Sequence, residues 1–339
     1  MKKYFIALVV MLLFLAGCSA KGNETSSKEF DEITVFFVPS RDPKEVETKT
    51  EPLKQLIIDE MKKEGYTIGA VNIEVSPTYE SAGEALDAGK AHIGFIPAST
   101  YALYSADKNV DVILAAARDG LNKDSVEAKD WNDGEPTLPV EEQVTYYRSL
   151  IYAGTSPKGR ELAEIVNSGK ELTWENLNGA TWCHSNTTSS AGYVQPSVWL
   201  AERFDGKMIE NLDNKIEVTG YPDTAARLAT GQCDVGVGYA DIRRDYEKNW
   251  TDEWSKENIW KETDIIGVTD KIMNDTISVS NKLVDADMKV ALQKAFKEIA
   301  KTESGKEAIS IYNHTGYQEV TDADYDPSRK VLEALKDRQ

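Results

Sequence analysis

Short apolar runs alternate with stretches of helical spacing through the first third of the chain. The apolar runs predict buried strands at residues 33–38, 71–75, 91–96 and 112–117. Apolar residues spaced three and four apart predict helices at residues 51–64, 79–88 and 97–104. Because strands that alternate with helices are typical of an α/β layer, we expect a mostly parallel sheet flanked by helices.

A second α/β unit follows a polar interruption. Residues 119–144 show no clean period and contain Pro136 and Pro139, so we interpret them as a long surface excursion. The pattern then predicts strands at 149–153, 180–184, 215–218 and 233–237, and helices at 160–167, 194–204, 223–230 and 241–249. Return strands are expected at 265–268 and 276–279, and final helices at 287–301, 305–311 and 329–336.

The length of the chain also points to two units. A chain of 339 residues exceeds the size that one core usually reaches. We therefore predict that residues 33–150 and 268–339 form lobe 1 and that residues 151–267 form lobe 2, inserted through two crossing strands. Clefts between two such lobes are favoured sites for small ligands.

The first residues indicate the compartment. Lys2 and Lys3 precede an apolar run at residues 4–15, which is too short to span a bilayer and has the length of a signal-peptide core. The run ends in Leu15-Ala16-Gly17-Cys18, which resembles the cleavage signal of bacterial lipoproteins. We predict a signal peptide at residues 1–17, a lipidated Cys18 and a flexible tether at residues 18–32, with the folded part outside the cytoplasmic membrane. The alternative is a plain secretory signal with a chance cysteine.

Charge and cysteine content narrow the partners. With 39 Lys and Arg against 57 Asp and Glu, the net charge is −18, which disfavours binding to nucleic acid or to anionic membrane surfaces. Membrane contact is therefore expected through the lipid anchor only.

Cys183 and Cys233 lie in predicted strands of one lobe and either form a disulfide or remain buried thiols. With three Cys and three His in the chain, we expect no metal site and no cofactor.

Three loops that follow predicted strands carry small hydroxyl residues. They are residues 39–41, 97–100 and 187–192, and the last two lead directly into predicted helices. A helix start leaves amide groups free and carries a partial positive charge, and hydroxyls there add hydrogen-bond donors. We therefore expect an anion site formed by Ser99, Thr100, Thr188, Ser189 and Ser190 at the carboxyl ends of the strands. The alternative is that these hydroxyls only cap their helices.

The run Ser189-Ser190-Ala191-Gly192-Tyr193-Val194-Gln195-Pro196 resembles a known signature. It is similar to the helix start of the phosphate, phosphite and phosphonate substrate-binding proteins of ABC importers, and the resemblance covers nearly the whole mature chain. The resemblance implies a two-lobed fold of the periplasmic-binding-protein type II. It also implies a monomeric binding protein, not an enzyme, that captures a small phosphorus oxyanion by hinge closure and delivers it to ABC permease subunits.

The resemblance further implies ligand contacts for individual residues. Tyr79 and Tyr146 match tyrosines that donate their hydroxyls to the phosphonate, and Ser189, Ser190 and Ala191 match the anion-binding helix start. Ala191 departs from the usual third hydroxyl of the signature. The alternative for the tyrosines is ordinary packing.

Three more candidates come from the same resemblance. Tyr221 stands where some members have a histidine, and Asp241 and Asp275 align with acids that grip the ammonium of aminophosphonates. Both acids together would favour a zwitterionic ligand over bare phosphate, because carboxylates repel an anion that lacks a cationic end. The alternatives are packing for Tyr221, a helix N-cap for Asp241 and a turn position for Asp275.

Two other functions stay open at this point. The same fold could bind another small organic anion, such as a sulfonate or a thiamine precursor. A hydrolase could use Ser189 or Ser190 with His184, although the Gly-x-Ser-x-Gly nucleophile elbow is absent around both serines.

Overall fold

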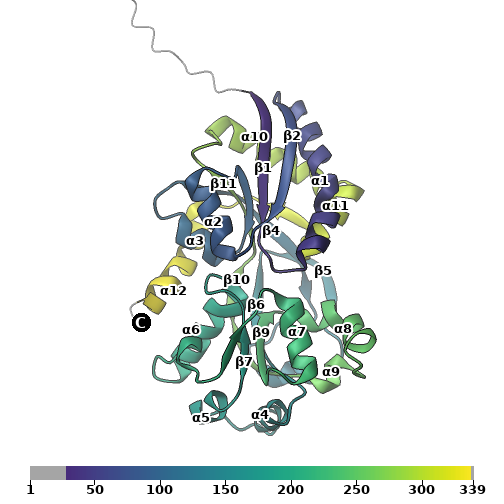
Figure 1. Cartoon of the computed structure of the whole chain (residues 1–339), viewed down its shortest axis with the longest axis vertical. Coiled ribbons are helices and arrows are strands. Elements are labelled where there is room, and N and C mark those ends of the chain that lie inside the picture. Colours follow the sequence, from purple (N-terminus) through teal and green to yellow (C-terminus); the bar gives the residue numbers. More distant parts are fainter. Residues whose placement is uncertain (1–27, 337–339) are drawn as a thin grey trace, which may run out of the picture.

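The computed structural model describes residues 28–336 and contains two stacked lobes (Figure 1). Lobe 1 is built on a seven-stranded sheet in the order β12-β4-β11-β3-β1-β2, with β5 paired to β4. Its strands are β1 (Glu29–Phe37), β2 (Thr67–Val75), β3 (Ile93–Ile96), β4 (Val110–Leu121), β5 (Pro139–Val144), β11 (Thr276–Ser280) and β12 (Gly316–Gln318). The predicted signal peptide (residues 1–17) and the predicted lipidation site Cys18 lie outside the described residues. The same holds for the predicted tether up to residue 27.

Helices cover both faces of the lobe 1 sheet. One face packs against α1 (Pro43–Lys63), α10 (Ala286–Ile299) and α11 (Glu303–Ile309). The other face packs against α2 (Tyr79–Ala88) and α3 (Ala98–Tyr104). Both faces of the central strands are therefore buried, which explains their continuous apolar runs.

Lobe 2 is built on a five-stranded sheet in the order β10-β6-β9-β7-β8. Its strands are β6 (Tyr146–Ala153), β7 (Trp182–His184), β8 (Lys215–Glu217), β9 (Val235–Tyr239) and β10 (Asp264–Met273). Its helices are α4 (Pro157–Asn167), α5 (Trp174–Asn178), α6 (Gln195–Arg203), α7 (Tyr221–Thr230), α8 (Ile242–Asp252) and α9 (Ile259–Glu262). A π-helical turn, η2 (Ser190–Val194), runs directly into α6. The α/β class and the type II architecture are those expected.

The expectation of mostly parallel sheets is wrong in detail, because both sheets are mixed. In lobe 1, β1 pairs in parallel with β2 and β3, whereas β11, β12 and β5 pair antiparallel. In lobe 2, β7 pairs in parallel with β8 and β9, whereas β6 pairs antiparallel with β9 and β10. Most of the antiparallel pairs involve β5, β6, β10 or β11, the strands that flank the two crossings between the lobes. These strands run in the direction opposite to their neighbours in the sheet.

The two crossings between the lobes lie side by side. The chain leaves lobe 1 between β5 and β6 at Thr145 and returns between β10 and β11 at Asn274. The Asn274 amide donates to the Thr145 carbonyl at 2.9 Å. Its side chain donates to the carbonyls of Ala116 and Val144 at 2.9 and 3.0 Å. Asn274 therefore holds the two crossing segments together.

The predicted surface excursion at residues 119–144 is in part a connection between the lobes. Its ends extend the lobe 1 sheet through β4 and β5, but Trp131 at its middle is buried in the core of lobe 2. The Asn132 side chain donates to the Ile265 carbonyl at 2.9 Å and accepts from its amide at 2.7 Å. The polar composition concealed this arrangement because a single buried tryptophan gives no period.

Two boundaries in lobe 1 also differ from the sequence-based expectation. β1 begins at Glu29, inside the predicted tether, because it pairs with β2 from Thr67 onward. The first helix begins at Pro43 and not near residue 51, because Asp42 caps it by accepting from the Glu45 amide. The loop at residues 39–41 therefore leads directly into a helix, as the other two loops do.

The last helix, α12 (Asp326–Lys336), also touches both lobes. It packs against α3 of lobe 1 and against α6 of lobe 2, where Leu335 joins Val194 and Met208 in an apolar cluster (Figure 1). Among residues 28–336, no helix combines the length and the apolar character that a membrane crossing requires.

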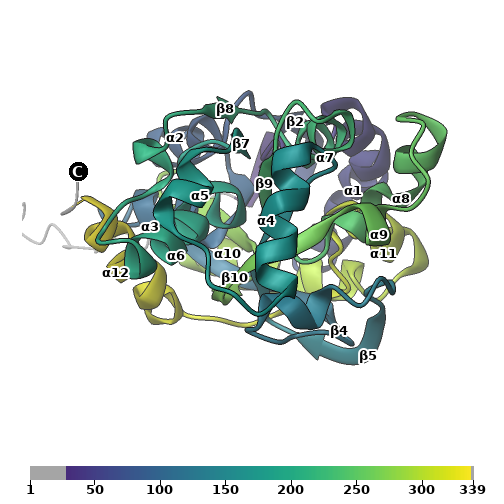
Figure 2. The ribbon, with the colours of Figure 1, turned by 90° about the horizontal axis from the view of Figure 1, so that it is seen from below.

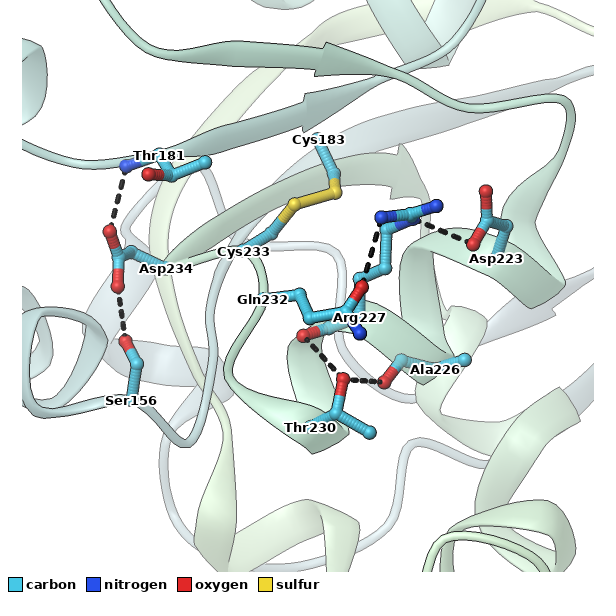
Figure 3. The surroundings of a disulfide bond; sticks show 10 residues. All are labelled: Ser156, Thr181, Cys183, Asp223, Ala226, Arg227, Thr230, Gln232, Cys233 and Asp234. Atoms are coloured by element: carbon cyan, nitrogen blue, oxygen red, sulfur yellow. Dashed lines mark hydrogen bonds and ion pairs between the residues drawn. A yellow bond between two sulfur atoms is a disulfide. The ribbon is translucent and has the colours of Figure 1, made fainter.

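Cys183 and Cys233 form a disulfide within lobe 2 (Figure 3). Cys183 lies in β7, and Cys233 lies two residues before β9, so the bond ties two neighbouring strands. Beside it, the Asp234 carboxylate accepts from the Ser156 hydroxyl at 2.5 Å and from the Thr181 amide at 2.7 Å (Figure 3). The pairing alternative of the sequence analysis is thus the correct one.

Candidate functional site

A small polar cavity of about 30 Å³ lies between the lobes. We call it the interlobe cavity. It is lined by five tyrosines, two arginines, three serines, one acid and two apolar residues: Val38, Ser40, Arg41, Tyr79, Pro97, Arg118, Tyr147, Ser189, Ser190, Tyr221, Tyr239, Asp275 and Tyr312. Since one water needs roughly 10–15 Å³, this space accepts a group of only a few atoms.

The helix start at Ser190 faces this cavity with free donors. Ser189 caps the helix by accepting from the Gly192 amide at 3.2 Å. Within the described part of the chain, nothing accepts a hydrogen bond from the amides of Ser190 and Ala191. Because η2 continues into α6, the positive end of the combined helix dipole lies at these two amides. The arrangement suits an anion.

Three tyrosine hydroxyls add uncharged donors. Tyr79 is buried, and its hydroxyl lies near Ser189 without a hydrogen bond of standard geometry. The Tyr221 hydroxyl lies 3.4 Å from the Ser189 hydroxyl. Burial raises the pKa of Tyr221 to about 12, although its contact with Ser189 opposes the shift. Burial also raises the pKa of Tyr79 and of Tyr147 well above the usual value. All three phenols therefore stay protonated at physiological pH and can donate.

Tyr146 does not line the interlobe cavity, whereas its neighbour Tyr147 does, and the role of Tyr146 as a ligand residue stays a prediction. The Tyr146 hydroxyl donates to Asp124 at 3.1 Å, and the Lys271 ammonium lies 3.6 Å from the centre of its ring. Tyr147 lines the interlobe cavity with its hydroxyl toward Ser190. Successive residues of a strand point to opposite faces, so only one of the two tyrosines can reach the cavity.

Two arginines of the cavity were not predicted. Arg41 reaches from lobe 1 to lobe 2, where it forms an ion pair with Asp245 at 2.6 Å and donates to the Tyr246 hydroxyl at 3.1 Å. Arg118 forms an ion pair with Asp275 at 2.6 Å, and its buried Nε has no hydrogen-bond partner. Arg41 lies in the loop after the predicted strand 33–38, and Arg118 directly follows the predicted strand 112–117. Because ligands bind at the carboxyl ends of such strands, these positions could have identified both arginines.

Asp275 lines the interlobe cavity, but its carboxylate already forms an ion pair with Arg118. Burial opposes its ionisation, but the charge of Arg118 and hydrogen bonds from His314 and Arg118 outweigh burial and lower the pKa to about 2. The His314 ring nitrogen lies 3.3 Å from the same carboxylate oxygen. Asp275 is therefore an ionised acid whose positive partner comes from the protein.

Asp241 does not line the interlobe cavity, and its role as a ligand residue stays a prediction. It caps α8 and forms a fully buried ion pair with Arg243 at 2.7 Å. The Thr137 hydroxyl of the 119–144 segment also donates to it, at 2.9 Å. With Asp241 withdrawn and Asp275 neutralised by Arg118, the argument for a zwitterionic ligand no longer holds.

The other predicted hydroxyl residues, Ser99, Thr100 and Thr188, do not line the cavity but take part with Ser190 in contacts between the lobes. The Ser190 hydroxyl accepts from the Ser99 amide at 3.0 Å and donates to the Ser99 hydroxyl at 2.9 Å. The Thr100 hydroxyl donates to the Thr188 carbonyl at 3.2 Å. Ser99 and Thr100 belong to lobe 1, whereas Thr188 and Ser190 belong to lobe 2, so these contacts cross between the lobes.

Close packing at Gly220 also brings the two lobes together. A Cβ at Gly220 would lie 2.8 Å from the Pro39 carbonyl oxygen of the opposite lobe. Glycine at this position thus permits the contact between the lobes beside the cavity.

The geometry does not support a hydrolytic Ser-His pair. The His184 ring contacts the Ser185 carbonyl at 2.8 Å and packs on Tyr193, and His184 is absent from the cavity lining. Burial lowers the pKa of His184. Within residues 28–336, no cluster of three or more His, Cys, Asp or Glu is arranged to hold a metal ion.

Comparisons with solved structures agree with this fold. A binding protein component of an ABC phosphonate transporter from Pseudomonas aeruginosa superimposes with a TM-score of 0.62 at 14% identity, covering 91% of this chain and 87% of its own. A Prochlorococcus marinus protein in complex with methylphosphonate gives 0.62 at 13% identity, covering 90% and 98%. A Xanthomonas citri protein bound to chloride gives 0.64 at 14% identity, covering 91% and 98%. At such identities the likeness establishes the fold.

The family comparison covers most of the chain. No curated protein matches the sequence. The family model described as "ABC transporter, phosphonate, periplasmic substrate-binding protein" matches residues 35–325. This family comprises transport proteins and is not an enzyme class. The chain therefore belongs to the family of periplasmic substrate-binding proteins of ABC phosphonate transporters.

Proposed function

We propose that this protein captures a small phosphorus oxyanion, namely a phosphonate, phosphite or phosphate, in the interlobe cavity and delivers it to an ABC permease. The observation that carries the proposal is the set of unoccupied donors in a closed space of about 30 Å³. The residues that line this space include Ser190, whose amide is free, and Tyr79, Tyr147 and Tyr221, whose hydroxyls can donate to one tetrahedral group. The Ala191 amide, which is also free, follows Ser190 at the same helix start.

These donors are compatible with the acidic character of the whole chain. Salt screens distant carboxylates beyond about 8 Å, whereas the donors act in direct contact. Each hydrogen bond to a charged group contributes roughly 1.5–3 kcal/mol, and micromolar binding requires about 8 kcal/mol. A few such bonds suffice even after the cost of ordering the ligand.

Hinge closure is the proposed mechanism. The donors of Tyr79 come from lobe 1 and those of the Ser190 helix start from lobe 2, so only the closed arrangement offers both. A ligand that contacts both lobes shifts the population toward this arrangement. The hinge lies at Thr145 and Asn274, and the permease would recognise outer faces that only the closed state aligns.

The compartment forms part of the same proposal. We infer that Cys18 carries the lipid anchor after removal of residues 1–17, and that the protein acts as an extracytoplasmic, membrane-anchored monomer. Mass spectrometry of the membrane-extracted protein should find an acylated Cys18 at its amino terminus. An unmodified amino terminus at another residue would contradict the anchor without touching the binding proposal.

Isothermal titration calorimetry tests the ligand class. We expect methylphosphonate, phosphite or phosphate to bind with micromolar or tighter affinity, and 2-aminoethylphosphonate to gain nothing from its ammonium group. Sulfate and methylsulfonate serve as tetrahedral controls, and a thiamine precursor tests a larger anion. Heat from the sulfur or thiamine compounds alone would favour the other organic-anion function, and the absence of heat with every phosphorus compound would reject ours.

A further inference from the structure

The beginning of the last helix, α12, is attached to lobe 1. Tyr325, the residue before the helix, is buried beside Tyr101 of α3, and the centres of the two rings lie 4.9 Å apart. In the first turn, Arg329 donates to the Ser105 hydroxyl at 2.7 Å and to the Asp322 carbonyl at 3.0 Å. Because these partners all belong to lobe 1, the beginning of α12 is fixed to that lobe.

The end of α12 reaches lobe 2 through apolar side chains. Val331 and Leu335 lie one turn apart on the same face of the helix. They join an apolar cluster with Val194, Ala201 and Met208 of lobe 2. Figure 2 shows α12 beside α3 and α6, the helices of the two lobes that it contacts. Among the described residues, the hydrogen bonds and ion pairs of the α12 side chains stay within lobe 1, so the contact with lobe 2 is apolar.

This apolar cluster lies next to the helix start that carries the anion donors. Ser190, whose amide is free, begins the turn η2, and Val194 ends it. Val194 is buried in the cluster with Leu335. None of the described residues of α12 lines the interlobe cavity. The helix therefore contacts the element that binds the anion without contacting the place where the anion would lie.

Separation of the lobes would break the contact between α12 and lobe 2. A rotation about the crossings at Thr145 and Asn274 would leave α12 on lobe 1 and move α6 away from it. Val331, Leu335 and their partners would then be exposed to water, which costs free energy in proportion to the apolar area. Because α12 does not line the cavity, this cost is the same with and without a ligand.

Building on the hinge closure of the proposed function, we propose that α12 is a strap that stabilises the closed arrangement, so that the ligand-free protein already populates it. Val331 and Leu335 are positioning residues, which act on binding without touching the ligand. The observed affinity is the affinity of the closed arrangement multiplied by the fraction of ligand-free molecules that adopt it. A weaker strap therefore weakens the binding of every ligand by the same factor.

Distance measurements by electron paramagnetic resonance test the strap without a ligand. Spin labels at Lys62→Cys on α1 and Glu164→Cys on α4, two exposed positions, report the separation of the lobes. We expect two separations in the ligand-free protein, the shorter of which matches the arrangement in Figure 1. Leu335→Ala should reduce the population of the shorter separation about fivefold. In calorimetry, it should weaken the binding of methylphosphonate and of phosphite by that same factor.

The matched control is Leu56→Ala, the same substitution on α1, where the side chain packs against the core of lobe 1. It should leave the populations and the affinities unchanged. Glu333→Ala, at an exposed position of α12, should do the same, whereas Val331→Ala should act in the direction of Leu335→Ala.

The possible outcomes separate the strap from the proposed function. Equal populations in the wild type and in Leu335→Ala, or a loss of affinity without a change in the populations, would overturn the strap, while methylphosphonate binding by the wild type still supports the proposed function. Failure of every phosphorus compound to bind would reject the proposed ligand, whereas the ligand-free populations would still decide on the strap. A single separation that neither the ligand nor Leu335→Ala changes would overturn both the strap and hinge closure.

Discussion

Tyr146 and Tyr147 are neighbours on β6, but their hydroxyls lie in different surroundings. Tyr146 donates to Asp124 at 3.1 Å on the outer side, whereas Tyr147 faces Ser190 in the interlobe cavity. Both have a phenol, and burial keeps the Tyr147 phenol protonated by raising its pKa well above the usual value. Only the Tyr147 hydroxyl is therefore positioned to donate to a bound anion.

Replacement of each hydroxyl separately tests this assignment. Tyr147→Phe should weaken methylphosphonate binding roughly 10- to 100-fold, because one hydrogen bond to a charged group contributes about 1.5–3 kcal/mol. Tyr146→Phe, the same change one residue earlier, should stay within about twofold of the wild type. Calorimetry of both variants measures the difference, and equal losses would contradict the assignment.

At the scale of elements, lobe 2 depends on the covalent tie between β7 and the start of β9. Its sheet has short strands at this edge, since β7 and β8 contain three residues each. The disulfide closes a loop of 50 residues between Cys183 and Cys233. Closing such a loop restricts the unfolded chain, which by loop entropy corresponds to about 4 kcal/mol of stability. The tie also fixes the strand that leads into the Ser190 helix start.

The double variant Cys183→Ser/Cys233→Ser should therefore unfold more easily. We expect the free energy of unfolding in urea to fall by roughly 2–4 kcal/mol, since measured losses for native disulfides lie in this range. Ligand affinity of the folded fraction should change little, because neither sulfur lines the cavity. The wild type measured under reducing conditions is the control and should lose the same amount. An unchanged urea midpoint in both would contradict this role of the bond.

At the scale of the whole molecule, the closed state depends on contacts that cross between the lobes. Arg41 of lobe 1 binds Asp245 of lobe 2, where the carboxylate also accepts from the Tyr239 hydroxyl at 2.5 Å and from Asn313 at 3.0 Å. Burial opposes ionisation of Asp245, but the charge of Arg41 and these hydrogen bonds lower its pKa to about 2. The carboxylate of Asp245 therefore favours the folded, closed molecule only while it is ionised.

The pH dependence of stability follows from this pKa. Because the pKa of Asp245 is lower in the folded protein than in the unfolded chain, its contribution is complete above about pH 4. That contribution is lost as the pH falls toward 2, where the unfolded chain binds the proton first, and it corresponds to roughly 2 kcal/mol. Asp275 has the same low pKa and should contribute in the same window.

Thermal unfolding between pH 2.5 and pH 7 tests this linkage. The wild type should lose some stability between pH 7 and pH 5, because burial lowers the pKa of His92, His184 and His314, and should lose stability steeply below pH 4. Asp245→Asn should be less stable at pH 7, since Arg41 loses its partner. It should also show a shallower loss of stability in acid, with Asp275 and the other carboxylates of lowered pKa supplying the rest. An acid limb as steep in the variant as in the wild type would rule out Asp245 as one of the responsible groups.

Local patterns in the sequence were sufficient for most elements and for the family, whereas β5, β12, α5 and α9 were not predicted. The helix at residues 79–88 coincides with α2 because Thr78 and Gly89 provide local caps. The hydroxyl run at Ser189 indicated a helix start with free amides, which depends only on neighbouring residues. The strand-helix alternation likewise follows from the period of the apolar residues.

The tertiary structure alone decided which side chains meet in the cavity. Tyr147 in place of Tyr146, the pairing of Asp241 with Arg243, and the presence of Arg41 and Arg118 depend on the face of a strand and on partners far along the chain. The insertion of Trp131 into lobe 2 is of the same kind. Periodicity reports which face of one element is buried, but it carries no information on what lies opposite, and a site between two lobes consists of such opposite partners.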